Sequence, residues 1–239
     1  MRLLAADNGR GVAGTRITAL ELREQTMAVG ITQDEWRGAL DGRFGRELRE
    51  RFENARVAVC GLGGLGSNVA IALARSGVGT LDLFDFDRVD ITNPNRQQYE
   101  VAQLGMPKTE AMADNLARIA PYCQVHAQTL RIAEGDIPGL FDADDVVCEC
   151  FDNPVAKAML VQGVLEAYPG KPLVAASGMA GLSTANTIRT RKVGRSLYLC
   201  GDGESDVADG LGLVSSRVLA CAAHEAHMVL RLLAGKADP

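Results

Sequence analysis

Four polar residues of this chain are of the types that bind a triphosphate: Asn93, Arg96, Lys108 and Asp152. Arginine and lysine neutralise phosphate oxygens, the first as a planar fork and the second as a point charge. An asparagine amide can donate a further hydrogen bond. A carboxylate at the carboxyl end of a parallel strand suits Mg²⁺, which takes one or two carboxylates together with phosphate oxygens and water. These residues predict a site for ATP and Mg²⁺.

A glycine-rich turn precedes them in the chain. Gly61, Gly63 and Gly66 match the pattern G-x-G-x-x-G, with Gly64 between them, after an apolar run and before a helical segment. Glycine permits the tight turn and the approach of a phosphate, and the helix N-terminus offers N–H groups to it. Asp85 follows at a separation of about 20 residues, where a carboxylate accepts from ribose hydroxyls. The turn alone does not distinguish a dehydrogenase from an enzyme that uses ATP. It is also compatible with a glycine turn that binds no ligand.

The elements that must position these residues alternate between strands and helices. Strands are expected at Arg56–Cys60, Thr80–Phe84, Gln124–Thr129, Asp145–Cys150 and Leu173–Ala176. Helices are expected at Ser67–Ser76, Thr109–Ala120 and Pro154–Tyr168. The last third adds a strand at or beyond the sheet edge, a strand that can pair with it and a long helix, at Ser183–Arg191, Ser196–Cys200 and Leu213–Leu233. The order predicts an α/β, Rossmann-like fold: a mostly parallel sheet with flanking helices and a short C-terminal strand pair plus helix.

The amino-terminal part is harder to interpret. We expect residues 1–35 to be an extension of unclear role and residues 36–239 to be the nucleotide-binding domain. Thr18–Val29 has a helical pattern, and Thr32–Glu35 fits a capping box. A charged helix follows, which we expect to break near Gly42 or Gly45 and to end by Asn54.

Composition excludes several classes of protein. The 239 residues carry a formal net charge of -5 and are 47% apolar, which favours a large core and gives no reason to expect nucleic acid or an anionic membrane as a partner. The first 14 residues lack the apolar core of a signal peptide, so the cytoplasm is the expected location. The six cysteines include no Cys-x-x-Cys pair, so we expect no zinc site of that kind.

The set of motifs resembles the ThiF/MoeB family, the bacterial relatives of ubiquitin-activating enzymes. The matching pieces keep the family's order from about residue 43 to residue 190: Gly61-x-Gly63-Gly64-Leu65-Gly66-Ser67, Asp85-x-Asp87, Asn93-x-x-Arg96-Gln97, Pro107-Lys108 and Asp152-Asn153. The segments Asn93–Tyr99 and Ala175–Gly181 look most like the short, zinc-free branch that adenylates sulfur-carrier proteins of thiamine biosynthesis.

The resemblance implies a role for each matching residue. Gly63 and Asp85 hold the adenosine, and Asn93, Arg96 and Lys108 bind the phosphates. Asp152 binds Mg²⁺ and is needed for catalysis. The remaining nucleotide-site positions are Gly61, Gly64, Gly66, Asp87 and Asn153. In the family an arginine ahead of the first strand reaches the γ-phosphate of the neighbouring subunit in a homodimer, so Arg46 is the candidate here, unless it merely faces solvent.

The implied reaction activates a small ubiquitin-like sulfur-carrier protein of the ThiS-like kind. Its C-terminal Gly-Gly carboxylate attacks the α-phosphorus of ATP, and pyrophosphate leaves to give an acyl-adenylate. Cations are needed because two anions approach each other, so catalysis is expected to depend on Asp152 with Mg²⁺, Arg96, Lys108 and Arg46. The glycine-containing loop Ser177–Gly181 is expected to line the channel for the tail.

Several alternatives stay open. The same family activates molybdopterin-type carriers and the tRNA threonylcarbamoyl group, although no basic C-terminal extension for tRNA is present. An NAD-dependent oxidoreductase would have no use for Arg96, Lys108 and Asp152, and a non-catalytic carrier-binding subunit would tend to lack Asp152. Asp152 could instead cap the helix that begins near Pro154. Cys200 is a candidate for a covalent link to the carrier, although a free cysteine is more often a small buried hydrophobe.

Overall fold

The computed structural model describes residues 30–239, so the helix predicted at Thr18–Val29 and most of the predicted extension lie outside the described residues. The capping box is confirmed: the Glu35 amide donates to Thr32 Oγ1 at 3.2 Å, and the Thr32 amide donates to the Glu35 carboxylate at 2.7 Å. Helix α2 (Gln33–Phe44) follows it. Gly45, with φ of +89°, breaks the chain direction before α3 (Arg46–Glu53).

A seven-stranded sheet with the order β3-β2-β1-β4-β5-β7-β6 forms the centre of the molecule. The strands are β1 (Arg56–Cys60), β2 (Thr80–Asp85), β3 (Gln124–Thr129), β4 (Val146–Glu149), β5 (Leu173–Ala176), β6 (Arg189–Val193) and β7 (Leu197–Gly201). All neighbours are parallel except β6, which pairs antiparallel with β7. The predicted α/β, Rossmann-like class is therefore confirmed. The strand order reverses between β1 and β4, which is where such sheets bind ligands.

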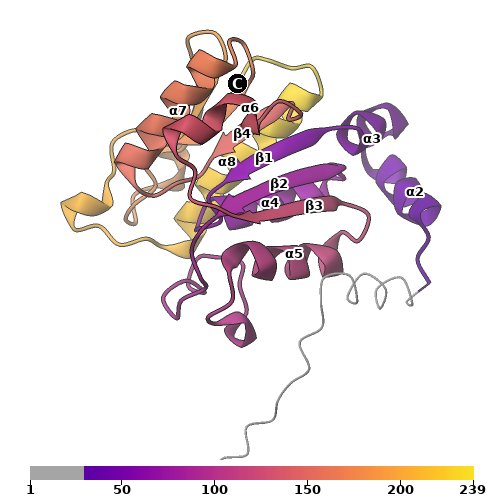
Figure 1. Ribbon diagram of the computed structural model, residues 1–239, viewed down its shortest axis with the longest axis horizontal. Coiled ribbons are helices and arrows are strands. Elements are labelled where there is room, and N and C mark those ends of the chain that lie inside the picture. The colour runs from indigo at the N-terminus through magenta and orange to yellow at the C-terminus, as the bar shows by residue number, and fades with distance from the viewer. Residues whose placement is uncertain (1–29) are drawn as a thin grey trace, which may run out of the picture.

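Helices cover both faces of the sheet (Figure 1). They are α4 (Gly66–Arg75), α5 (Lys108–Ile119), α6 (Ile137–Leu140), α7 (Pro154–Ala167) and α8 (Ser215–Leu233). One buried cluster joins the sheet to α4, α5 and α8, and the other joins it to α6 and α7. Val57 and Val59 belong to the first cluster, and Ala58 and Cys60 to the second. This two-sided burial explains why β1 is a continuous apolar run.

The edge strand of the carboxyl-terminal third begins later in the chain than predicted. The edge strand was expected to begin at Ser183, but it begins at Arg189, and Ala185–Thr187 forms a 3₁₀ turn. The reason is a hydrogen bond: the Ser183 carbonyl accepts from the side chain of Arg217. The predicted pairing with the following strand is confirmed, and α8 begins two residues later than expected.

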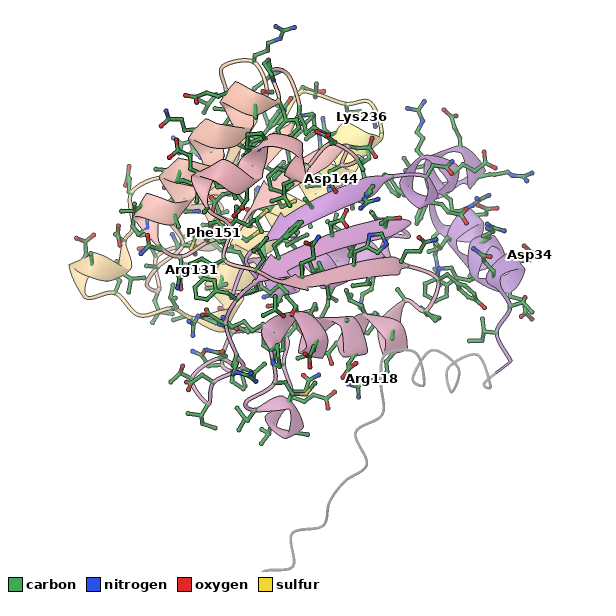
Figure 2. The ribbon with its side chains drawn as sticks, in the orientation of Figure 1. Asp34, Arg118, Arg131, Asp144, Phe151 and Lys236 are labelled. Atoms are coloured by element: carbon green, nitrogen blue, oxygen red, sulfur yellow. The ribbon has the colours of Figure 1, made fainter. Side chains whose placement is uncertain are left out.

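The two ends of the sheet carry different parts of the chain. Figure 1 shows α2 and α3 at one end, and the loops that follow β5 and β7 projecting from the opposite, carboxyl end. In Figure 2, Arg131 and Phe151, which follow β3 and β4, lie toward the carboxyl end, whereas Asp34 of α2 lies at the far side. None of the helices in residues 30–239 is both long and apolar enough to cross a membrane.

Candidate functional site

The glycine turn between β1 and α4 is closed on one side and open on the other. A Cβ on Gly61 would lie 2.9 Å from the carbonyl oxygen of Cys150, and a Cβ on Gly66 would lie 1.8 Å from the carbonyl oxygen of Gly61. Gly61 also has φ of +92°, which disfavours other residues. At Gly63 the nearest heavy atom to an added Cβ is 4.0 Å away. The turn therefore packs against the sheet and leaves the Gly63 backbone open to a ligand.

Asp85, at the end of β2, fixes the turn. Its carboxylate accepts from the Leu62 amide at 2.6 Å and from the Asp87 amide at 2.7 Å. The buried Tyr99 hydroxyl donates to the Leu62 carbonyl at 2.8 Å. Both carboxylate oxygens thus hold backbone N–H groups, so a ribose hydroxyl would have to use their remaining lone pairs.

Lys108 is placed beside Asp85 by a short backbone ladder. The Lys108 amide donates to the Asp87 carbonyl at 2.9 Å, and Arg88 and Pro107 form an isolated β-bridge. The buried Lys108 Nζ lies 3.0 Å from the Asp87 carboxylate and 4.0 Å from that of Asp85. Asp87 therefore holds the ammonium group at the carboxyl end of β2.

Asn93 and Arg96 lie in the turn that follows. Asn93 is buried, and its side-chain oxygen accepts from the Asp90 amide at 2.9 Å. Arg96 donates to the Asn95 side chain at 2.8 Å, and its Cγ and Cδ are each 3.5 Å from the Cβ position of Gly64. The fold thus brings the arginine stem directly against the glycine turn.

Gln97 is a candidate that the sequence interpretation did not single out for a role. It is 7% exposed, and its Oε1 has no hydrogen-bond partner among the residues that the structure describes. Its Nε2 is the atom 4.0 Å from the Cβ position of Gly63. An unsatisfied buried amide costs free energy, so its place beside the open side of the turn favours a polar ligand there. Its position next to Arg96 in the motif was the available signal.

Asp152 and Asn153 have different environments, although they are neighbours. Asn153 is the N-cap of α7: its side-chain oxygen accepts from the amides of Val155 and Ala156, both at 3.0 Å. The alternative in which Asp152 caps this helix is therefore wrong. The Asp152 side chain is exposed and forms no hydrogen bond or ion pair with the residues from 30 to 239. An exposed carboxylate at the switch point fits a Mg²⁺ ion whose other ligands are phosphate oxygens and water.

A buried ion pair supports the loop that carries Asp152. Glu149 is fully buried at the end of β4 and accepts from the Phe151 amide at 2.7 Å. Its second oxygen accepts from Lys157 Nζ on α7. Burial raises the pKa of the Glu149 carboxyl, although Lys157 and the Phe151 amide act in the opposite direction. The pair ties the loop to both β4 and α7.

Arg46 is not brought to this site within the same chain. Its side chain is 78% exposed and forms an ion pair with Glu50 one helical turn away, at 3.0 Å. Figure 1 shows α3 at the end of the sheet away from the glycine turn.

Cys200, the candidate for a covalent link to the carrier, has the environment of a small buried hydrophobe. It lies in β7, is 1% exposed, and burial raises its pKa to about 12. The thiolate is the nucleophilic form, so this environment does not favour a covalent link to a carrier.

The fold and the turn define a Rossmann-like nucleotide-binding protein, and comparisons with known proteins agree. The model of the ThiF family matches residues 39–239, so the chain belongs to the ThiF family. It is 38% identical over 173 residues to a molybdopterin-synthase adenylyltransferase of Salmonella typhimurium, over 71% of this chain and 66% of that protein. It is 40% identical over 139 residues to a tRNA threonylcarbamoyladenosine dehydratase of Bacillus subtilis, over 57% of this chain and 54% of that protein.

The fold is also similar to that of a solved relative. The tRNA N6-threonylcarbamoyladenosine dehydratase of E. coli, in complex with ATP, superposes with a TM-score of 0.76 at 23% identity, over 86% of this chain and 97% of that one. The matched part of the chain thus spans about two thirds of the Salmonella adenylyltransferase and about half of the Bacillus dehydratase. It spans nearly the whole of the solved E. coli chain.

Proposed function

We propose that residues 36–239 form an ATP-dependent adenylyltransferase domain, which activates the C-terminal glycine carboxylate of a small ubiquitin-like sulfur-carrier protein. The observation that carries this proposal is the convergence at one sheet end of the open Gly63 backbone, the Arg96 stem and the exposed Asp152 carboxylate. The names of the adenylyltransferase relatives support it. A thiamine-pathway carrier is the first choice, because of the Asn93–Tyr99 and Ala175–Gly181 segments.

Each residue has a task in this reaction. The Gly63 backbone admits the phosphates, while Arg96 and Lys108 neutralise their oxygens as charge develops. Asn93 offers an amide hydrogen beside the turn, and the Gln97 Oε1 offers an acceptor for a hydroxyl or amino group of the nucleotide. Mg²⁺ held by Asp152 would withdraw further charge from the phosphates. The adenosine lies toward Asp85 and Phe86, over whose ring the Arg131 guanidinium stacks at 3.7 Å from the centroid.

We propose a homodimer for the complete site. Arg46 lies on α3, at the end of the sheet away from the glycine turn of its own chain, so a catalytic role for it requires the turn of a second copy. An arginine supplied from a neighbouring subunit is a known means of neutralising a transferring phosphate.

Isotope exchange between pyrophosphate and ATP tests the proposed function. Exchange should require Mg²⁺ and a carrier ending in Gly-Gly, and it should disappear when the two glycines are removed. Separate reactions with a thiamine-type carrier, a molybdopterin-type carrier and threonylcarbamoyl-modified tRNA distinguish the substrates, because labelled ATP forms only with a substrate that the enzyme adenylates. Calorimetry showing micromolar NAD affinity and no ATP binding would overturn the proposal.

A further inference from the structure

One buried arginine holds together two loops at the carboxyl end of the sheet. Arg217, in the first turn of α8, is 3% exposed. Its Nη1 donates to the carbonyls of Ser183 and Thr184 at 2.6 and 2.7 Å, and its Nη2 donates to Thr187 Oγ1 at 3.2 Å and to the Asp202 carboxylate at 2.5 Å. Arginine is seldom this buried, and removing one partner of such a pair leaves an uncompensated charge.

Asp202 continues the network on the other side. Its Oδ1 accepts from the amides of Glu204 and Ser205, both at 2.9 Å, and its Oδ2 accepts from the Ser205 hydroxyl at 2.8 Å. Burial acts to raise the pKa of Asp202, but these hydrogen bonds and that from Arg217 lower it to about 2. The Ser205 hydroxyl in turn accepts from the Ala180 amide at 3.0 Å. Each loop is therefore fixed to the other and to α8.

The two loops, residues 177–187 and 202–214, form what we call the lobe. They lie together beyond the carboxyl ends of β5 and β7 (Figure 1), where the Gly181 amide donates to the Gly212 carbonyl at 2.8 Å. A Cβ on Gly178 would lie 1.9 Å from Asp202 Oδ1, so the contact leaves no room for a side chain. The lobe exposes an apolar side chain, Leu182, to 83%. Glycine-containing loops of this kind lose much conformational entropy on ordering, and the Arg217 network is what orders them.

The base of the lobe touches the nucleotide end of the site. Val218, the residue after Arg217, has a Cγ1 only 3.0 Å from the Cβ position of Gly64. The Asn95 side-chain amide donates to the Leu213 carbonyl at 3.5 Å. The first turn of α8 thus holds the lobe and contacts the glycine turn, and Leu213 of the lobe contacts the turn that carries Arg96. These contacts set the position of the lobe relative to the phosphates.

We propose that Arg217, together with Asp202, is a positioning residue that holds the lobe as one wall of the passage by which the tail of the carrier protein reaches the nucleotide. This inference rests on the proposed function. A flexible tail reacts fast only if its path is preorganised, and a displacement of about 1 Å costs on the order of a hundredfold in rate. The network lies outside the phosphate-binding groups, so it acts on the carrier and leaves ATP binding unchanged.

Arg217→Lys and Asp202→Asn test this role. Lysine cannot serve four acceptors at once, because it lacks the planar fork. Arg231→Lys is the matched control, because Arg231 also lies in α8 and pairs with Asp238 near the chain end, at 2.7 Å. Pyrophosphate exchange should show the KM for the carrier raised on the order of tenfold to a hundredfold in both test variants. The KM for ATP and its calorimetric affinity should change less than twofold, and the control should behave as the wild type does.

The outcomes separate this inference from the proposed function. A wild-type chain that binds ATP but exchanges with no Gly-Gly carrier overturns the proposed function and this inference with it. An active wild type whose Arg217→Lys variant loses carrier and ATP affinity equally, or neither, overturns this inference alone. If Arg217→Lys fails to fold, Gly178→Ala displaces Asp202 from the opposite side. An unchanged KM for the carrier in that variant would also contradict the proposal.

Discussion

Replacing Glu225 by glutamine should stabilise the protein increasingly as the pH rises. Glu225 lies in α8, is fully buried, and neither oxygen of its carboxyl group has a hydrogen-bond partner within residues 30–239. Burial raises its pKa well above 4.5, and Glu149 acts in the same direction while Lys157 opposes it. Glutamine has the same shape as the protonated acid and carries no charge at any pH, so the substitution removes the titration and leaves the packing.

The magnitude follows from the difference in bound protons. Above pH 4.5, the ordinary value for this group, the unfolded chain releases the Glu225 proton while the folded chain retains it. The contribution of Glu225 to the free energy of unfolding is therefore fully present below the unfolded pKa. It falls as the pH rises, by about 1.4 kcal/mol for each pH unit up to the folded pKa. The advantage of glutamine should therefore grow by about 1.4 kcal/mol, or roughly 3 to 6 °C in Tm, for each pH unit above the unfolded pKa until the folded carboxyl titrates.

Denaturant unfolding at pH 5, 6, 7 and 8 measures this difference. Glu166→Gln is the control, since Glu166 is exposed on α7 and accepts from Gln162 at 2.8 Å. The control should show the same stability difference at every pH. A Glu225→Gln difference that stays flat with pH, or a variant less stable than the wild type at pH 7, would refute the reasoning, because Glu225 would then be ionised and partnered in the folded chain.

Three further outcomes are expected. Asp152→Asn should lower pyrophosphate exchange by roughly a hundredfold, the scale for losing one electrostatic group, with Tm unchanged because the side chain has no partner in the described chain; a variant with normal exchange would remove Asp152 from the mechanism. Asn153→Ala should cost about 1 kcal/mol in denaturant unfolding through the lost α7 cap, and unchanged stability would show the cap to be unimportant. Arg46→Ala and Asp152→Asn, each strongly impaired alone, should regain activity when mixed and allowed to exchange subunits, and no recovery would argue against an arginine supplied across a dimer.

Local patterns in the sequence determined the nucleotide-binding half of the protein. The turn from Gly61 to Gly66 depends on the conformational freedom of glycine, and the strands around it, including the one that ends at Asp85, depend on runs of apolar residues. Both effects act over a few neighbouring positions. The order of motifs from Asn93 to Asp152 was enough to indicate the family. These features need no knowledge of what packs against them.

Only the tertiary structure decided which polar residues are buried and what they bind. Asp152 and Asn153 both permit an N-cap by spacing, and the cap went to Asn153 because its side chain reaches two amides of α7. The pattern of α8 does not reveal that Arg217 and Glu225 are buried, since their environment comes from segments distant in sequence. The Arg217 partner Ser183 lies 34 residues away. The free energy of a buried charge depends on every group around it, and that set exists only once the chain has folded.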